Sequence, residues 1–466
     1  MSAITSRLTD DQRKKLLSLF NRAQLHLLFK ASIHGFAADQ FHFRCDKQGP
    51  TICVAYNPSG FVYGAYTSKD FAQTKQNIID EHAFLYSISE ERPRPIRVGV
   101  NAGQPAFVDE STGPNFGALL FLNDNTATVV SPGGAAYTFN ATELHQDNLI
   151  LTEFEVYRVE ELGGLLDKPW RIVQWNEEKR QELKKQIQSY CPDVRGVKEA
   201  RVLMVGPVGA GKSSFFNSIN SVFRGNMTSQ AITGTAGKSL TVQFRTYTMK
   251  AGKGGPAVPL VLCDTMGLEE GTDAGLNPDD VINICKGHVQ DRYQFSQSAS
   301  LQEGTPGYRK HVTLKDKIHC VVYVLDAGRV SLMGQKMLDK LRTIRKKANH
   351  MGVPQILLMT KIDEACPLVE KDFKNVYHSV YLQKKAREVS ESLGIPLSCI
   401  VPVRNYCTEL ELNPDVDILL LSAVELMLNY TDSFFENLAP EDQEETDQPE
   451  LYRSNDQSFN KNKVIV

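Results

Sequence analysis

The chain lacks several features that would mark a specialised class of protein, and each absence excludes something. Its nine cysteines include no C-x-x-C pair and stand beside no histidine cluster, which argues against a zinc framework and favours thiols in a reducing compartment over disulfides. A net charge of −3 gives no reason to expect nucleic acid or an anionic membrane as a partner. No run approaches the roughly 18 apolar residues of a membrane span, and residues 1–7 lack the apolar core of a signal peptide. We therefore expect a chain without a transmembrane segment whose cysteines are free thiols.

Residues 206–213 read GPVGAGKS and match the phosphate-loop pattern G-x-x-x-x-G-K-[ST] without a mismatch. Residues 201–205 before them have strand character, and residues 214–219 after them predict the first turns of a helix. This strand–loop–helix context argues against a chance match in a glycine-rich turn. The residues that we expect to contact the phosphates of a nucleotide are Gly206, Gly209, Ala210, Gly211, Lys212, Ser213 and Ser214.

The parts of this loop have distinct roles toward phosphate. Glycines let successive backbone N–H groups point at one spot, and the helix N-terminus adds partial positive charge there. Lys212 reaches the terminal phosphates, and Ser213 ligates Mg²⁺. About 50 residues later, an apolar strand ends in Asp264-Thr265-Met266-Gly267, a D-x-x-G motif at the strand end where ligands bind in open α/β sheets. We expect Asp264 to hold Mg²⁺ through water and the Gly267 N–H to meet a γ-phosphate.

A third motif addresses the base. The apolar run 355–359 ends in Thr360-Lys361-Ile362-Asp363, which fits [NT]-K-x-D. Asp363 would accept the N1 and N2 hydrogens of guanine, and the stem of Lys361 would lie over the ring. Adenine lacks that pair of donors, so a carboxylate here selects GTP over ATP. In isolation the motif fits a solvated charged loop, but as the third motif in order it favours guanine recognition. A small-molecule kinase gives no reason for it.

Two further elements are weaker. The run 397–403 predicts a last strand, and the loop after it is assigned by position alone to meet guanine O6, because no S-A-K triplet is present. Thr233 and Thr235 are candidates for a switch threonine that contacts Mg²⁺ and the γ-phosphate, but a plain polar loop explains them almost as well. The sequence does not choose between the two interpretations.

The residue after D-x-x-G bears on hydrolysis. Ras-like enzymes carry a glutamine there that orients water, whereas this chain has Leu268. We therefore expect slow hydrolysis, or a catalytic group supplied from elsewhere, for example by a second copy of the chain on dimerisation. Residues 269–316 are long for a switch region and include a predicted helix over 278–285. Because long insertions are often functional, we expect a nucleotide-controlled contact surface there.

Strand and helix patterns alternate over residues 201–430, which predicts a mostly parallel sheet covered on both faces. Residues 240–247 alternate with period two and lead through Lys253-Gly254-Gly255-Pro256 into the next strand, so one edge strand should be antiparallel. After about residue 439 the chain is acidic and poor in apolar residues, which predicts disorder. The expected parts are a first domain over 1–160, a helical connector over 161–198, a phosphate-loop domain over 199–438 and a tail over 439–466.

The first 160 residues have a different pattern. Apolar residues over 16–29 predict a helix, and short strands follow at 51–56, 61–66 and 82–88 between glycine and proline turns. Strands with little helix between them favour a sandwich. We find no nucleophile–base pair or metal-ligand spacing in this part of the sequence. On residue chemistry alone it is a binding or structural domain.

Both halves resemble a known family. FHFRCD at 41–46, GFVYGAYTS at 60–68, GPNFG at 113–117 and FEVY at 154–157 resemble the TLDc domain. A TLDc domain followed by a GTPase-like domain with D-T-M-G and T-K-I-D resembles the layout of the interferon-induced protein 44 family. The resemblance implies a TLDc β-sandwich flanked by helices, joined to a Ras-like phosphate-loop domain. It also implies a cytoplasmic, interferon-inducible protein of antiviral defence, and GTP binding more securely than turnover.

Two classes of function remain open at this point. In the first, the chain is a slow GTPase whose GTP/GDP cycle, with Mg²⁺, reshapes the 269–316 insertion and so controls a protein partner. In the second, it binds guanine nucleotide without turnover and acts as a scaffold whose TLDc domain recruits the partner. Catalytic residues are not identifiable in either case.

Overall fold

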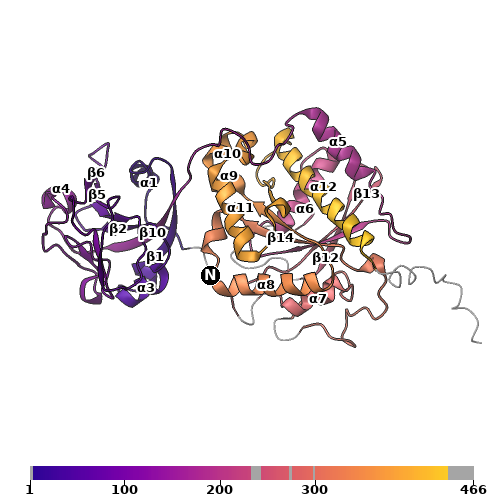
Figure 1. Cartoon of the computed structure of the whole chain (residues 1–466), viewed down its shortest axis with the longest axis horizontal. Coiled ribbons are helices and arrows are strands. Elements are labelled where there is room, and N and C mark those ends of the chain that lie inside the picture. Colours follow the sequence, from indigo (N-terminus) through magenta and orange to yellow (C-terminus); the bar gives the residue numbers. More distant parts are fainter. Residues whose placement is uncertain (1–3, 232–242, 272–274, 297–299, 439–466) are drawn as a thin grey trace, which may run out of the picture. The chain divides into compact units, whose positions relative to one another are not determined.

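The computed structural model describes residues 4–231, 243–271, 275–296 and 300–438 (Figure 1). The chain divides into two units, Ala3–Gly164 and the part from Leu165 on, and each is described by itself. The candidate switch residues Thr233 and Thr235 and the tail over 439–466 lie outside the described residues.

A six-stranded antiparallel sheet is the centre of the N-terminal unit. Two short two-stranded sheets and four helices surround it, which confirms the expected sandwich with helices. In spatial order the large sheet comprises β1 (Ala23–Lys30), β10 (Glu153–Glu161), β2 (Thr51–Tyr56), β3 (Val62–Thr67), β5 (Phe84–Ile88) and β6 (Ile96–Gly99). The small sheets pair β4 (Gln76–Ile78) with β7 (Phe107–Asp109) and β8 (Leu120–Phe121) with β9 (Val129–Val130). The helices are α1 (Asp10–Leu17), α2 (Ala31–His34), α3 (Ala38–Cys45) and α4 (Ala141–His145).

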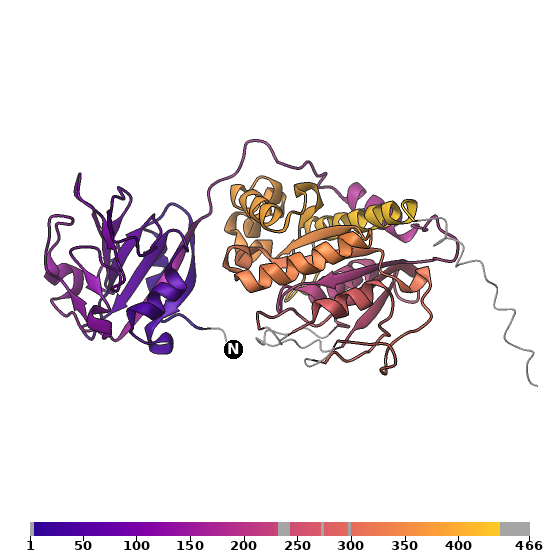
Figure 2. The same cartoon turned by 60° about the horizontal axis from the view of Figure 1, so that its bottom comes forward.

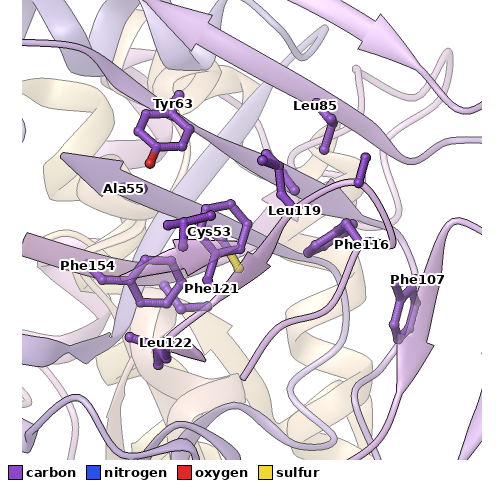
Figure 3. Packing of buried hydrophobic residues seen from close by; sticks show 14 of the residues in the cluster. Cys53, Ala55, Tyr63, Leu85, Phe107, Phe116, Leu119, Phe121, Leu122 and Phe154 are labelled. Atoms are coloured by element: carbon purple, nitrogen blue, oxygen red, sulfur yellow. The ribbon is translucent and has the colours of Figure 1, made fainter. Parts of the chain in front are cut away.

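The central strands of this sheet are buried on both faces, so alternate residues enter two different cores. Cys53 and Ala55 of β2 face the larger core, where the rings of Phe121 and Phe154 stack with centroids 5.2 Å apart (Figure 3). Ile52 of the same strand faces a second core that includes residues of α1. Burial on both sides explains why these strands read as nearly continuous apolar runs.

The helix predicted over residues 16–29 is wrong beyond its first two residues. Helix α1 ends at Leu17, and the chain turns into strand β1. A β-bulge between Leu27 and Phe29 shifts the pairing with β10, so that Leu25 and Leu27 pack on one core while Phe29 enters the other. Because a bulge inserts an extra residue, it breaks the period-two alternation that would have indicated a strand.

The second unit holds a six-stranded, mostly parallel sheet. Strand β12 is antiparallel to β13, and every other neighbouring pair is parallel, as the sequence predicts. In spatial order the strands are β12 (Arg245–Lys250), β13 (Ala257–Asp264), β11 (Ala200–Val205), β14 (Cys320–Asp326), β15 (Gln355–Thr360) and β16 (Ile400–Pro402). Residues 397–399 form a 3-10 turn instead of continuing the predicted last strand, with the Cys399 N–H donating to the Pro396 carbonyl.

Helices cover both faces of this sheet, which confirms the doubly covered arrangement (Figures 1 and 2). One face carries α5 (Glu177–Gln188), α6 (Lys212–Arg224) and α12 (Pro414–Glu436). The other carries α7 (Pro278–Cys285), α8 (Gln335–His350) and α11 (Val380–Leu393). Shorter elements are α9 (Ile362–Ala365), α10 (Pro367–Lys371) and the 3-10 turns η2 (Leu314–Asp316), η3 (Ala327–Leu332) and η4 (Phe373–Tyr377).

Helix α12 is the one helix among the described residues that is long and apolar enough, by length and composition, to cross a membrane. Most of its apolar stretch, 61%, is buried inside the unit, where it packs on α5, β11, β14 and β15. Its Asp417 is fully buried and accepts hydrogen bonds from Arg180 Nε at 2.7 Å and from the Tyr406 hydroxyl at 2.6 Å. These contacts are those of a core helix.

Candidate nucleotide-binding site

The GPVGAGKS segment lies between the end of β11 and the first turn of α6. Gly209 and Gly211 have φ angles of 76° and 95°, in the left-handed region that disfavours residues with a Cβ. Gly211 precedes the first helical residue, Lys212, and no side chain caps the helix. The first N–H groups of a helix have no partner within the helix. The loop therefore gathers backbone donors at the positive end of α6, where an anion binds well.

The Lys212 ammonium is buried within this loop. Its Nζ donates to the carbonyl oxygens of Gly206 at 3.0 Å and Pro207 at 3.1 Å. Burial lowers the pKa of Lys212, and the nearby Asp264 carboxylate opposes that effect. A phosphate in the loop would offer this ammonium an anionic acceptor, which is a stronger partner than a carbonyl.

Ser213 and Asp264 meet beside the lysine. The Ser213 hydroxyl donates to Asp264 Oδ2 at 2.5 Å, and the Thr265 N–H donates to Oδ1 at 2.9 Å. Burial raises the pKa of Asp264, although Lys212 and these hydrogen bonds favour its charged form. A hydroxyl and a carboxylate are hard oxygen donors of the kind that Mg²⁺ takes. No cluster of three His, Cys, Asp or Glu able to hold a metal occurs among the described residues, so Mg²⁺ here would need phosphate and water oxygens as well.

The D-x-x-G segment is clamped to the phosphate loop by two backbone hydrogen bonds. The Val208 N–H donates to the Leu268 carbonyl at 3.2 Å, and the Leu268 N–H donates to the Gly206 carbonyl at 3.0 Å. Gly267 fits between them because a Cβ there would lie 2.8 Å from both the N and the Cα of Val208. The Leu268 side chain is 1% exposed and belongs to the core. The residue after D-x-x-G, where Ras-like enzymes carry a water-orienting glutamine, is thus packed in the core of this unit.

Thr360 supports the phosphate loop from β15. Its buried hydroxyl donates to the carbonyl oxygens of Ala210 at 2.7 Å and Leu325 at 3.1 Å. The sequence predicts Thr360 among the nucleotide contacts, and the structure turns its hydroxyl toward the loop. Its geometric role is therefore to fix the loop relative to the strand that carries the next motif.

Lys361 and Asp363 follow immediately, and each has a charged partner. Lys361 has a φ of 56° and places its Nζ 3.0 Å from Asp326 Oδ2, at the end of β14. Asp363 Oδ2 accepts from Arg404 Nε at 2.7 Å. Asp326 ends β14 and Asp363 follows β15, so both carboxylates lie at the same edge of the sheet as the phosphate loop. The structure thus brings the three predicted motifs to one edge.

Sequence reasoning missed Asn217 and Asp326, and it missed the contact made by Asn405, which lies in the loop 404–406 that it assigned by position to guanine O6. Asn405 Nδ2 donates to the Gly211 carbonyl at 3.0 Å, although the two residues are 194 positions apart. Asn217 of α6 accepts from the Gln230 and Ala231 N–H groups, both at 2.9 Å, and so fixes the segment before residue 232. Asp326 could have been found, since a charged residue ending an apolar strand run marks this edge. The two asparagines carry no local signal.

The described part of the 269–316 insertion is held by contacts to helix α8 and by a contact within itself. Lys340 of α8 donates to the carbonyl oxygens of Glu269 at 2.7 Å and Gly271 at 2.6 Å. Buried Asp280 of α7 accepts from the Leu301 N–H at 2.7 Å. The insertion thus begins at the clamped D-x-x-G segment and continues along α8.

Comparisons with known proteins match both units of the chain. A family model of the TLDc domain matches residues 3–160. Interferon-induced protein 44-like from Homo sapiens is 36% identical over 451 residues, covering 94% of this chain and 97% of that protein. Interferon-induced protein 44 is 34% identical in Homo sapiens, covering 94% of this chain and 95% of that protein. The Mus musculus protein of that name is 32% identical, covering 94% of this chain and 99% of that protein.

Solved structures matched by the fold include Toc33 from Arabidopsis thaliana in complex with GDP and Mg²⁺. It is 12% identical with a TM-score of 0.32, covering 55% of this chain and 92% of that chain. A GTP-binding protein from Sulfolobus solfataricus in complex with GDP is 14% identical with a TM-score of 0.24, covering 52% of this chain and 53% of that chain. The alignments with the sequence relatives cover nearly the full length of this chain and of each relative. The chain therefore belongs to the interferon-induced protein 44 family.

Proposed function

We propose that the second unit binds GTP together with Mg²⁺. The observation that carries the proposal is the joining of the three motifs at one sheet edge: Thr360 is bonded to the phosphate loop, and the D-x-x-G segment is clamped to it. In this arrangement the loop and Lys212 would hold the phosphates, and Ser213 and Asp264 would hold the ion. Mg²⁺ would neutralise phosphate charge and fix the geometry of the phosphate chain.

Guanine is the base that this edge favours. A carboxylate accepts two parallel N–H donors, and guanine offers that pair through N1 and N2, while Asp363 lies at the strand end next to the loop. The stem of Lys361, whose ammonium is held by Asp326, would cover the ring. Adenine presents an acceptor at N1 and would leave Asp363 without a donor.

The biological setting of the proposal comes from the family. Relatives named as interferon-induced support a protein of the interferon response. We propose in addition that the protein is cytoplasmic, acts in antiviral defence and engages a protein partner through the TLDc unit or the 269–316 insertion. Buried Leu268 favours slow turnover, so a slow switch and a scaffold that binds GTP without turning it over are both compatible with the site. Nucleotide analysis of the purified protein separates them: bound GDP favours turnover, and intact GTP favours the scaffold.

The test of GTP binding is calorimetry with the Mg²⁺ salt. Lys212→Ala should weaken binding by about 2–3 kcal/mol, the value of a charge-assisted contact to phosphate, which is roughly 30- to 150-fold in Kd. Lys347→Ala, which removes an exposed lysine of α8 that pairs with Asp279, is the matched control and should leave Kd unchanged. Unchanged affinity in a folded Lys212→Ala protein, or equal competition by ATP in the wild type, would refute the proposal.

A further inference from the structure

Arg404 directly contacts Asp363, the residue whose carboxylate we propose binds the base. Its Nε donates to Asp363 Oδ2 at 2.7 Å, and its guanidinium lies over the Phe373 ring, 4.9 Å from the centroid. One of its terminal nitrogens also donates to Glu409. Only about a fifth of each of these three charged side chains is exposed. The guanidinium is therefore held between two carboxylates and an aromatic face.

The far end of this contact is itself fixed. Glu409 Oε2 accepts from the Cys407 N–H at 2.7 Å and from the Thr408 N–H at 3.0 Å, which closes the loop after β16 on itself. Burial tends to raise the pKa of Glu409, but these backbone donors and Arg404 outweigh it and lower the pKa. A charged Glu409 anchors one side of the guanidinium, so the orientation of Arg404 does not depend on Asp363 alone.

We infer that Arg404 is a positioning residue that determines base specificity, by fixing the orientation in which Asp363 presents its carboxylate to the base. The inference rests on the proposed GTP binding. A planar guanidinium donating to Oδ2 sets the plane of the carboxylate, and it leaves Oδ1 and the second lone pair of Oδ2 for the two donors of guanine. Without that contact the carboxylate rotates, and the pair of bonds to guanine N1 and N2 loses its alignment.

The same geometry predicts the behaviour of an amide at position 363. In Asp363→Asn, the carbonyl oxygen must turn toward Arg404, because a guanidinium only donates. The NH₂ group then faces the base, where it repels the exocyclic amine of guanine and pairs with the C2 carbonyl of xanthine. Removing Arg404 frees the amide to flip, so the preference for xanthine should depend on Arg404.

Inosine triphosphate provides a readout that a merely structural role would not move. It lacks the exocyclic N2 amine, so the ratio of GTP to ITP affinity measures the second contact to Asp363 independently of the phosphates. Arg404→Ala should lower that ratio by about tenfold, the effect of losing one aligned charge-assisted bond. Arg404→Lys, which keeps the charge without the planar fork, should restore the ratio only in part.

The matched control is Arg342→Ala, which removes an arginine of α8 that pairs with Asp339 at 3.4 Å. It should leave the GTP to ITP ratio unchanged. In a second arm, Asp363→Asn should prefer xanthosine triphosphate to GTP, and Asp363→Asn combined with Arg404→Ala should lose most of that preference. If the alanine variant does not fold, Arg404→Met, which keeps an apolar stem beside Phe373 but has no donor, replaces it in both arms.

The possible outcomes distinguish a failure of the role of Arg404 from a failure of the proposed GTP binding. A wild-type protein that does not bind GTP refutes both. A wild-type protein that binds GTP tenfold or more tighter than ITP, with the same ratio in folded Arg404→Ala, overturns the role of Arg404 and leaves GTP binding standing. A reduced ratio together with a xanthine preference that depends on Arg404 establishes it.

Discussion

The clamp between the phosphate loop and the D-x-x-G segment can be tested with one methyl group. Gly267→Ala adds a Cβ that would lie 2.5 Å from Val208 Cγ2 and 2.8 Å from both the N and the Cα of Val208. The Val208 side chain can rotate, but its backbone cannot withdraw without moving the loop. The segment must therefore separate from the loop, and the two hydrogen bonds that join Leu268 to Gly206 and Val208 lengthen or break.

The expected magnitude follows from these contacts. Inserting a carbon into a closely packed contact costs about 1–3 kcal/mol. Weakening two backbone hydrogen bonds adds on the order of 1 kcal/mol. The free energy of unfolding of the second unit should thus fall by roughly 2–4 kcal/mol, or about 4–16 °C in melting temperature at 2–4 °C per kcal/mol. GTP affinity should fall as well, because the loop no longer holds its shape.

Thermal unfolding with and without GTP and Mg²⁺ measures both effects. Gly328→Ala is the control, since a Cβ there meets its nearest atom, Asp326 Oδ1, at an ordinary 3.5 Å, and its melting temperature should stay close to that of the wild type. If Gly267→Ala melts with the wild type and keeps its GTP affinity, the clamp is not rigid and its supposed role in shaping the phosphate site is wrong.

Two further predictions concern acid stability and rate. Burial tends to raise the pKa of Asp80, but hydrogen bonds from Ser68, Thr67 and His82 outweigh it and hold that pKa below the ordinary value of an aspartate. The stabilisation by Asp80 is therefore complete at a pH above the pKa in the unfolded chain, and it is lost as the pH falls through the pKa in the folded protein. Asp80→Asn should destabilise the N-terminal unit by about 1–3 kcal/mol at neutral pH and by less near pH 3, as measured by hydrogen exchange of β3. A stability difference between wild type and variant that does not shrink in acid contradicts this prediction. Intrinsic GTP hydrolysis should not exceed about 10⁻³ per second in single-turnover assays, and Leu268→Gln should lower stability without raising the rate, because it buries an amide among core residues. A rate per molecule that rises as the protein concentration increases from nanomolar to micromolar indicates that a second copy of the chain completes the catalytic site. Several turnovers per second by dilute protein would overturn the inference of slow hydrolysis from Leu268.

The sequence predicted the elements whose geometry is determined locally. The phosphate loop has its glycines, lysine and serine within eight consecutive positions, and the hairpin before Asp264 lies within one short stretch. The helix over 278–285 has the predicted bounds, with Asn277 capping its first turn. Strand β1 was missed because the bulge near Leu28 hides its alternation, and only the register against β10 reveals it.

The missing parts of the site depend on contacts between distant segments. Arg404 meets Asp363 across 41 positions, and Asn405 meets the carbonyl of Gly211 across 194. Nothing in the local sequence of the loop after β16 shows whether its arginine side chain pairs with a carboxylate or extends into solvent. The role of Leu268 was also hidden, because a motif position gives the identity of a residue but not the direction of its side chain.

Helix α12 has a consequence for the order in which the second unit is made. It is the last described element of the chain, yet it packs on β11, β14 and β15 and on α5, which is more than 200 residues earlier. During synthesis the sheet therefore emerges with the area under α12 uncovered, and local contacts alone cannot cover it. The phosphate loop forms early in the sequence but acquires its finished surroundings only when residues 414–436 arrive. A ribosome that stops before that point releases a sheet with the part of this face that α12 covers exposed to the chaperones and proteases of the cell.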